Sequence, residues 1–227
     1  NAKYLSGDVY DHYSEQLFPY QSWGSEYALA GFKKQGSERD QYRILSKEDA
    51  QLTITPTISS YSGTLGSSPI NIKAGQPYDI ITASPFHLKS TKPILVAGFL
   101  GDESSPKDPS YSLVVPVQQY RSDYSFMVPA DYNYNYITIT APKDIKSVKI
   151  YKIVNGVDNM VTEISNTQFT RIGNTNYSYY MHSMGTTHAA YKIIADKPIG
   201  VQSYGYYNQT SYAYPLGLNL TRLNNTN

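Results

Sequence analysis

The sequence predicts an all-β protein built from two sandwich-like halves, which are related by internal duplication and packed into one compact unit. Apolar residues alternate with polar ones over several short stretches, as is typical of half-buried strands. No window longer than about ten residues shows the apolar stripe of an amphipathic helix. Pro and Gly, 13 and 15 in number, divide the chain at the short intervals expected of a sandwich or barrel.

Several stretches carry the strand pattern. Residues 51–59 (QLTITPTIS), 124–128 (YSFMV) and 216–220 (LGLNL) alternate apolar and polar side chains. Residues 93–100 (PILVAGFL) are instead apolar without interruption, as expected of a strand covered on both faces. Residues 37–51 come nearest to a helical pattern, but they contain too few apolar side chains to anchor a helix.

A repeat links the two parts of the chain. Residues 18–32 (FPYQSWGSEYALAGF) align without a gap with residues 115–129 (VPVQQYRSDYSFMVP). Further along, residues 46–54 resemble 141–150, Gly75 corresponds to Gly185, and the tripeptide Lys-Pro-Ile at 92–94 returns at 197–199. Four matches in the same order indicate internal duplication. We therefore expect a first β half over residues 1–110 and a second over 111–227, joined through residues 101–111.

Composition excludes several classes of function. Charged residues make up 16 % of the chain and the net charge is +1, so nucleic acid is not an expected partner. The absence of Cys excludes disulfides, a thiol nucleophile and thiolate metal sites. No apolar run approaches the length of a membrane span, so we expect no membrane insertion. The Cys-free, Tyr- and Asn-rich chain has no leader pattern and looks like an excised piece of a bacterial secreted or surface protein.

No motif indicates catalysis or a cofactor. The chain lacks a GxSxG elbow, and no zinc-binding spacing joins its histidines, which are His12, His87, His182 and His188. We expect His188 at the edge of a turn, and we expect neither an enzyme nor a bound cofactor. Asp102, Glu103 and Asp108 lie among hydroxyl residues and offer oxygen ligands for Ca²⁺, but a solvated linker is the favoured interpretation.

Tyrosine is the most informative residue type, with 24 copies against 6 Phe and 1 Trp. Its amphipathic ring suits a surface that faces water or a ligand. Candidate ligand-binding residues lie in the stretch 131–140 and in a predicted hairpin over 204–214. They are Tyr132, Tyr134, Tyr204, Tyr206, Tyr207, Asn208, Tyr212 and Tyr214.

Two interpretations stay open for each group of tyrosines. In residues 131–140 the rings either form an exposed ladder opposite Ile137 and Ile139, or a bulge near Asn135 turns both sets inward. In the hairpin, where Gly205 indicates a bulge or a close backbone approach, the rings either stiffen the sheet or form a recognition surface. Stiffening is favoured there, although residues 92–104, the counterpart in the first half, lack tyrosines, which points to a role in binding.

The order of several motifs resembles the IgGFc-binding protein N-terminal domain family. The motifs are residues 15–32 (EQLFPYQSWGSEYALAGF), 74–80, 92–99, 108–120, 134–142, 185–206 and 211–217 (SYAYPLG). The resemblance implies a non-enzymatic adhesion module of a secreted or cell-surface protein, which binds an extracellular protein or glycan. A lectin-like module, or an oligomerisation unit of a surface fibre, is the alternative. Ile199, Gln202 and Ser203 depart from the pattern of relatives, so Fc recognition is not predicted.

Overall fold

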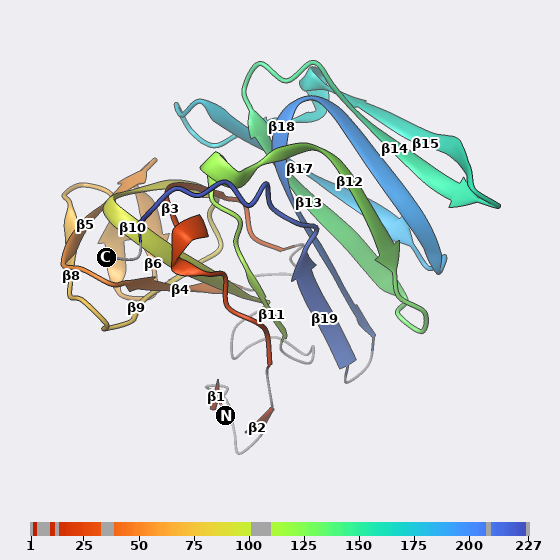
Figure 1. The fold of residues 1–227 in the computed structure, drawn as a ribbon. Coiled ribbons are helices and arrows are strands. Elements are labelled where there is room, and N and C mark those ends of the chain that lie inside the picture. The colour runs from red at the N-terminus through yellow and green to blue at the C-terminus, as the bar shows by residue number, and fades with distance from the viewer. Residues whose placement is uncertain are drawn as a thin grey trace.

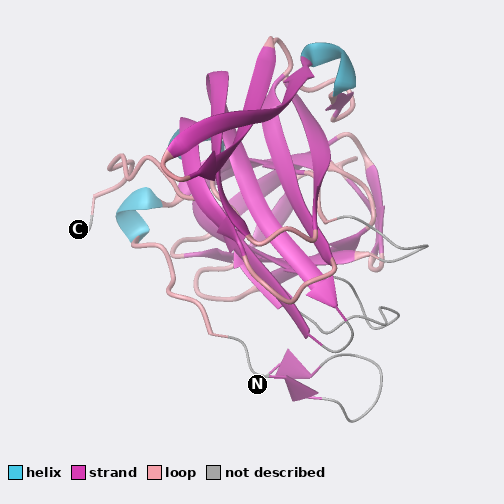
Figure 2. Cartoon of the chain, turned by 90° about the vertical axis from the view of Figure 1, so that its right-hand side faces the viewer, coloured by secondary structure: helices cyan, strands magenta, loops and turns pink. Residues whose placement is uncertain are grey.

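A computed structural model describes residues 2–3, 10–11, 14–32, 39–100, 110–207 and 210–225, and within them the fold is all-β (Figures 1 and 2). Two curled antiparallel sheets of seven and eight strands form the N- and C-terminal halves. The helical segments among the described residues are three short 3₁₀ turns, η1 (Tyr20–Ser22), η2 (Val117–Gln119) and η3 (Asn166–Gln168). The predicted fold class is therefore confirmed.

Each half has its own set of strands. The first sheet contains β3 (Gly24–Leu29), β4 (Asp40–Ser46), β5 (Ala50–Thr55), β8 (Ile70–Ile72), β9 (Tyr78–Thr82), β10 (Phe86–Leu100) and β11 (Ser110–Leu113). The second contains β12 (Arg121–Val128), β13 (Tyr134–Pro142), β14 (Ser147–Val154), β15 (Val157–Ser165), β16 (Thr170–Arg171), β17 (Tyr177–Gly185), β18 (Ala189–Tyr207) and β19 (Thr210–Pro215). Two small pairs join β1 (Ala2–Lys3) to β2 (Tyr10–Asp11), and β6 (Ile58–Ser60) to β7 (Gly63–Leu65).

The two sheets share one strand order. In the first it is β8-β5-β10-β4-β9, with β3 and β11 also paired to β10. In the second it is β15-β14-β18-β13-β17, with the short β16 added beyond β17 and with β12 and β19 also paired to β18. Each strand of the first sheet thus has a counterpart in the second, as internal duplication requires. The match between Gly75 and Gly185 is wrong, because Gly75 precedes β9 whereas Gly185 ends β17, the counterpart of β9.

The returning Lys-Pro-Ile marks a bend in the longest strand of each half. The first part of β10 pairs with β3 and β5, and its second part pairs with β4 and β11. Register with β3 jumps from Lys89 to Ile94, and register of β12 with β18 jumps from Ile194 to Ile199. Proline cannot donate a ladder hydrogen bond, so pairing breaks there and the strand crosses to the opposite layer.

An apolar core fills the space between the two layers of each half. Residues with at most 8 % exposure form both cores. The first core includes Tyr27, Leu29, Ile44, Leu52, Ile54, Ile80, Phe86, Leu88, Ile94 and Val96. The second includes Tyr124, Phe126, Ile137, Ile139, Val148, Ile150, Ile193, Ile199 and Val201. Burial of large aliphatic and aromatic side chains is the main favourable contribution to folding in a protein without disulfides.

One buried hydrogen bond recurs at the bend in both halves. The hydroxyl of Tyr27 donates to the carbonyl of Ile94, and that of Tyr124 donates to the carbonyl of Ile199, each over 2.5 Å. Burial raises the pKa of Tyr124 to about 12, so its hydroxyl stays protonated near neutral pH. Each of these two bonds gives a donor to a carbonyl at the bend, where the ladder of backbone hydrogen bonds is interrupted.

The C-terminal segment ties the two halves together. Gln119, which is fully buried in η2, donates through Nε2 to the carbonyl of Thr221 and accepts from its backbone N–H. Three residues later, the Asn224 side chain donates to the carbonyls of Tyr20, the first residue of η1, and of Trp23, which follows η1. Residues 216–220 were predicted to be a strand, but they are irregular, and Gly217 and Leu220 have φ of 138° and 58°. The N–H of Leu216 still donates to the carbonyl of Val201 in β18. The N–H groups of Asn219 and Leu223 then donate to the carbonyls of Gln119 in η2 and Gln21 in η1.

Replacing Tyr124 by Phe removes the donor to the buried carbonyl of Ile199. We expect Tyr124→Phe to lower the free energy of unfolding by about 1–2 kcal/mol, and Tyr27→Phe to do the same at Ile94. Urea denaturation followed by circular dichroism measures both changes. Tyr134→Phe is the control, because this ring is 47 % exposed. A loss for Tyr124→Phe no larger than that of the control would contradict the role given to this bond.

Candidate functional site

The predicted hairpin tyrosines lie on two opposite faces of one sheet layer. In the register of β13, β18 and β19, Tyr134 pairs with Tyr206, and Tyr212 pairs with Gly205. Because side chains alternate along a strand, Tyr204, Tyr206 and Tyr134 share one face. The other face carries Tyr207, Tyr212 and Tyr214. These residues therefore do not form a single surface.

Tyr204 and Tyr206 are buried, which corrects the expectation that they face a ligand. Their exposures are 0 % and 4 %, and they form a cluster with Phe32 and Leu100 of the first half. The ring of Phe32 meets that of Tyr204 edge-on, with the centroids 4.9 Å apart. The reason is that the outer face of β13 and β18 packs against the first half, which alternation alone does not reveal.

The same packing explains why the tyrosines at positions 204 and 206 have no tyrosine counterparts in the first half. Phe99 takes the place of Tyr204 in the first half, and it stacks on Tyr111 at 5.4 Å within its own sheet. The hydroxyl of Thr138 donates to the carbonyl of Gly31, again joining the sheet face of the second half to the first. This interface covers the outer face of β13 and β18 in the second half, whereas a different surface of the first half takes part in it. The two halves therefore differ in tyrosine content because they contribute different surfaces to the interface.

The remaining tyrosines keep part of their surface accessible. Tyr134 and Tyr207 are 47 % and 38 % exposed. The ring of Tyr212 covers Gly205, where a Cβ atom would come within 2.5 Å of it, and its hydroxyl donates to Asn135 Oδ1 over 2.9 Å. The close approach predicted at Gly205 is thus confirmed, whereas Asn208 lies outside the described residues.

Two further rings complete the placement of the candidate set. The edge of Tyr132 meets the ring of Tyr212 at 4.7 Å, and the hydroxyl of Tyr214 donates to the carbonyl of Met127 over 2.5 Å. A bulge is present near Asn135, where the register of β13 with β17 skips Met184. Beyond it, both faces of β13 are covered, so an exposed tyrosine ladder does not extend past Tyr134.

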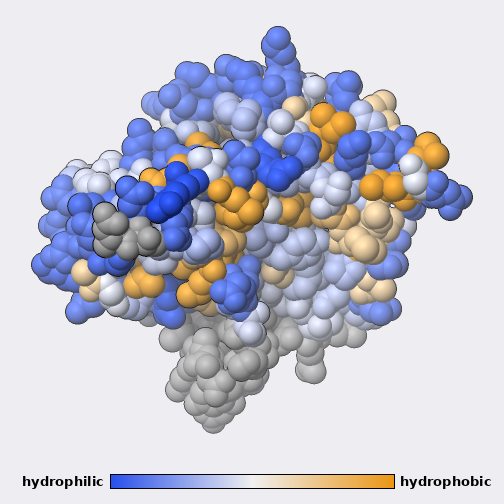
Figure 3. Space-filling model, in the orientation of Figure 1, coloured by the Kyte–Doolittle hydropathy of each residue, from blue (hydrophilic) through white to orange (hydrophobic). Residues whose placement is uncertain are grey.

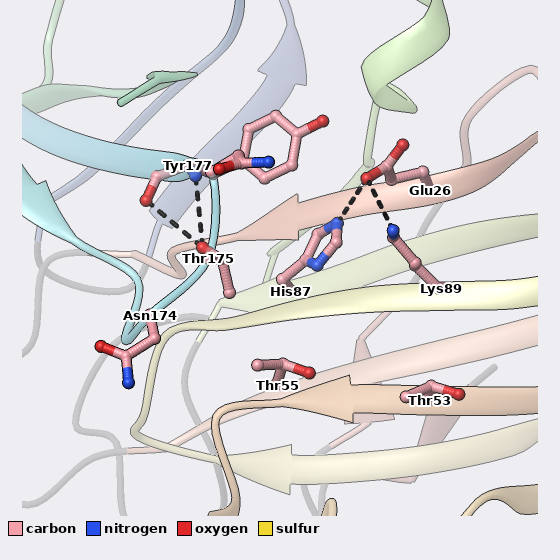
Figure 4. Close-up of a pocket in the computed structure, with 9 residues that line it drawn as sticks. Glu26, Thr53, Thr55, His87, Lys89, Asn174, Thr175 and Tyr177 are labelled. Atoms are coloured by element: carbon pink, nitrogen blue, oxygen red, sulfur yellow. Dashed lines mark hydrogen bonds and ion pairs between the residues drawn. The ribbon is translucent and has the colours of Figure 1, made fainter. Parts of the chain in front are cut away.

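A cleft of about 360 Å³ lies between the halves and is formed by β3, β5, β10 and the segment before β17 (Figure 4). It was not predicted from the sequence. Its lining side chains all carry polar or charged groups, and two of them have rings. They are Glu26, Thr53, Thr55, His87, Lys89, Asn174, Thr175, Asn176 and Tyr177. Clefts of this volume at the junction of two structural units are a common location of ligand sites.

Strand register assembles the wall from the first half. Lys89 of β10 lies opposite Glu26 of β3 on one side and Thr53 of β5 on the other. His87, two residues earlier, lies opposite Thr55. These side chains share one face because they are an even number of residues apart, while Leu88 between them points into the core. No local motif reveals this wall, since it forms only through pairing.

Glu26 holds the charged groups of the cleft together. Its Oε1 lies 2.8 Å from Nε2 of His87 and 3.8 Å from Nζ of Lys89, and all three side chains converge in Figure 4. Burial lowers the pKa of His87, against the opposing effect of Glu26, so the imidazole is neutral near pH 7. Burial, together with Glu26, raises the pKa of Tyr177 to about 12. The ion pair in the cleft thus joins one carboxylate and one ammonium group.

The opposite wall is a tight turn of the second half. The hydroxyl of Thr175 donates to the carbonyl of Ile172 over 2.7 Å and accepts the N–H of Tyr177 over 3.2 Å. Gly173 has φ of 52°, and a Cβ atom there would lie 2.9 Å from the ring of Pro56 in the first half. The turn is therefore fixed both internally and against the other half.

Beyond Tyr177 and Asn176, the surface continues into a second hollow of about 420 Å³. Val117, Tyr120, Pro142 and Pro198 contribute its apolar part. Tyr177 thus separates a polar compartment from a more apolar one.

Other predicted features are placed as follows. His188 directly precedes β18, as expected for a residue at the edge of a turn, and its Nδ1 lies 2.8 Å from the carbonyl of Val128. Asp102, Glu103 and Asp108 lie outside the described residues. Across the described ranges, no three His, Cys, Asp or Glu side chains are grouped as metal ligands. The same part of the chain contains no helix with the length and apolar character needed to cross a bilayer.

Comparison with known proteins identifies the family. A family model described as IgGFc binding protein matches residues 2–205, so the chain belongs to this family. No curated protein matches the chain.

Two solved structures show distant similarity. One is the stem and receptor-binding domain of the spike protein P1 from bacteriophage PM2, at 9 % identity, 83 % and 81 % coverage of the two chains, and a TM-score of 0.20. The other is the PBSX exported protein XepA, at 12 % identity, 77 % and 81 % coverage, and a TM-score of 0.22. At these scores the similarity does not bear on function.

The buried position of Tyr204 predicts a stability effect. We expect Tyr204→Ala to lower the free energy of unfolding by about 3–5 kcal/mol, because it opens a cavity between the halves. Tyr207→Ala, at a ring that is 38 % exposed, is expected to cost less than about 1 kcal/mol. Equal losses in urea denaturation would show that Tyr204 does not support the interface.

The environment of His87 predicts a dependence of stability on pH. A histidine whose pKa in the folded state lies below its ordinary value of 6.5 contributes stability above that pH, and this contribution is lost as the pH falls. We expect the free energy of unfolding to decrease from about pH 7.5 to about pH 5, and His87→Gln to make this decrease smaller. Part of it should persist, because burial also lowers the pKa of His182. Parallel curves for wild type and variant would exclude His87 as a source.

Proposed function

We propose that this chain is a non-enzymatic adhesion and ligand-binding module of a secreted or cell-surface protein. Its target is an extracellular macromolecule, either a protein or a glycan. The observation that carries the proposal is the preformed cleft between the halves, whose walls are held by strand pairing and by the turn at residues 172–177. Membership of a family that is named for binding agrees with it.

Binding on a rigid scaffold requires no conformational change of the protein. The cleft walls are strands and a turn closed by its own hydrogen bonds, so little conformational entropy is lost when a ligand enters. Glu26 is already engaged by His87 and Lys89, an arrangement that organises a surface rather than freeing a base for proton transfer. This geometry supports a passive recognition role.

A structural role in a surface fibre is the second candidate, and the exposed apolar side chains of one hairpin favour it. Val154, Val157, Met160 and Val161 on the hairpin of β14 and β15 are 44–61 % exposed. Apolar patches are visible over this part of the molecule in Figure 3. Exposed apolar residues on an edge strand suit contact with another protein chain. A stable oligomer that Met160→Lys dissociates would support this candidate.

A defined array tests the main proposal. The purified chain is applied to immobilised extracellular glycoproteins, their deglycosylated forms, free glycans and immunoglobulin Fc. We expect saturable binding to at least one component, and its persistence or loss on deglycosylation assigns the target to protein or glycan. Heat-denatured chain is the control for nonspecific adhesion. Absence of saturable binding throughout, or turnover of a bound component, would overturn the proposal.

A further inference from the structure

We propose that the cleft between the halves binds an uncharged saccharide unit of a glycan chain. The proposal rests on the binding function proposed above and specifies its ligand and its site. The walls of the cleft come from β3, β5 and β10 on one side and from residues 174–177 on the other. Its volume of about 360 Å³ lies at the small end of the range for ligand pockets.

Charge balance argues for a neutral ligand. Glu26 is placed within 4 Å of both His87 and Lys89, so the ammonium of Lys89 is offset by the carboxylate beside it. A phosphate, sulfate or sialic acid carboxylate would have to approach Glu26 and compete with it for these two partners. A free cation would meet a single carboxylate that is already paired. The field in the cleft therefore favours polar ligands without net charge.

The exposed polar groups match a polyhydroxy ligand. Thr53 and Thr55 present hydroxyls from β5, and Asn174 and Asn176 present amides from the opposite wall. Hydroxyls and amides both donate and accept, as the hydroxyls of a sugar do. The ring of Tyr177 stands beside them, 4.9 Å from the ring of His87, and offers an aromatic surface to the C–H face of a pyranose.

Pairing of the backbone argues against an extended peptide. Lys89 lies in the middle of the sheet, with β3 on one side and β5 on the other, so the backbone of β10 at this point is already paired on both edges. A peptide that adds to a sheet needs a free edge. The cleft instead presents side chains from the face of a sheet, which suits a ligand that is recognised through hydroxyl groups.

Continuity of the groove argues for a chain of sugars. Tyr177 and Asn176 line both the polar cleft and the neighbouring hollow of about 420 Å³. A glycan with one unit beside Glu26 can continue past Tyr177 towards Pro142 and Pro198.

The duplication supplies a matched control for testing this site. Thr53 lies opposite Lys89, which lies opposite Glu26. In the second half, Lys149 lies opposite Ile194, which lies opposite Asp123. Lys149 is therefore the counterpart of Thr53, on the same strand face but away from the cleft. Thr53→Trp fills the cleft, whereas Lys149→Trp adds the same ring at the equivalent position.

The experiment uses the full chain on an array of neutral, sialylated and sulfated oligosaccharides, followed by calorimetric titration of each glycan bound. We expect binding of neutral glycans, an affinity reduced more than tenfold in Thr53→Trp, and no change in Lys149→Trp. Asn174→Ala, a milder change at an exposed residue, is expected to reduce affinity about five- to tenfold through one lost hydrogen bond. Unfolding curves verify that each variant is folded.

Three outcomes would overturn this inference. They are binding confined to anionic glycans, unchanged affinity in both Thr53→Trp and Asn174→Ala, and binding of a deglycosylated protein without binding of any glycan. In the last case the chain remains a binding module and only the ligand class is wrong. If neither glycan nor protein binds, the proposed function itself fails.

Discussion

The fold depends on a single constraint that is used twice, the bend of the longest strand at Lys-Pro-Ile. A proline in mid-strand interrupts pairing and would leave a buried carbonyl without a donor. A tyrosine hydroxyl from the neighbouring strand supplies the donor in both halves, at Ile94 and at Ile199. Because the strand beyond the bend pairs with different neighbours, this one feature folds a curled sheet into two layers that enclose a core. A chain without cysteine thereby closes both cores through packing and hydrogen bonds alone.

Two similar halves pack here through dissimilar surfaces. The second half contributes the outer face of β13 and β18, and the first contributes the segments around Phe32 and Leu100. An interface of this kind leaves each half with a different set of covered and open faces. It buries Tyr204 in one place, and in another it brings the turn before Tyr177 over the polar face of β3, β5 and β10. The tyrosine cluster and the cleft are thus two consequences of one packing arrangement.

Strands and duplication could be predicted from the sequence, because alternation, the repeated Lys-Pro-Ile and the Tyr27–Tyr124 match are local signals. The bend at Lys-Pro-Ile was not predicted. What covers a strand face is not local. Alternation puts Tyr204 and Tyr206 on one face of the strand, but the same pattern fits a face covered by solvent, by a ligand or by another sheet. The cleft was missed for a related reason, since Glu26 and His87 are 61 residues apart and meet only through register. In residues 216–220 the alternation does not form a strand, as the segment continues to the turns of both halves.

Comparison of the two copies shows which positions the fold leaves free to diverge. Both copies keep a tyrosine on the core side of β3 or β12, and both keep the isoleucine whose carbonyl it binds. On the outer face, Glu26 and Lys89 in one copy correspond to Asp123 and Ile194 in the other. The residue types at the core positions are constrained by the bend, whereas those at the outer positions depend on the segment that packs against them. Only the outer face of the first copy, which carries Glu26 and Lys89, meets Tyr177 in the cleft. The combination of a balanced ion pair and hydroxyl groups on this face is therefore a property of the site and not a requirement of the fold.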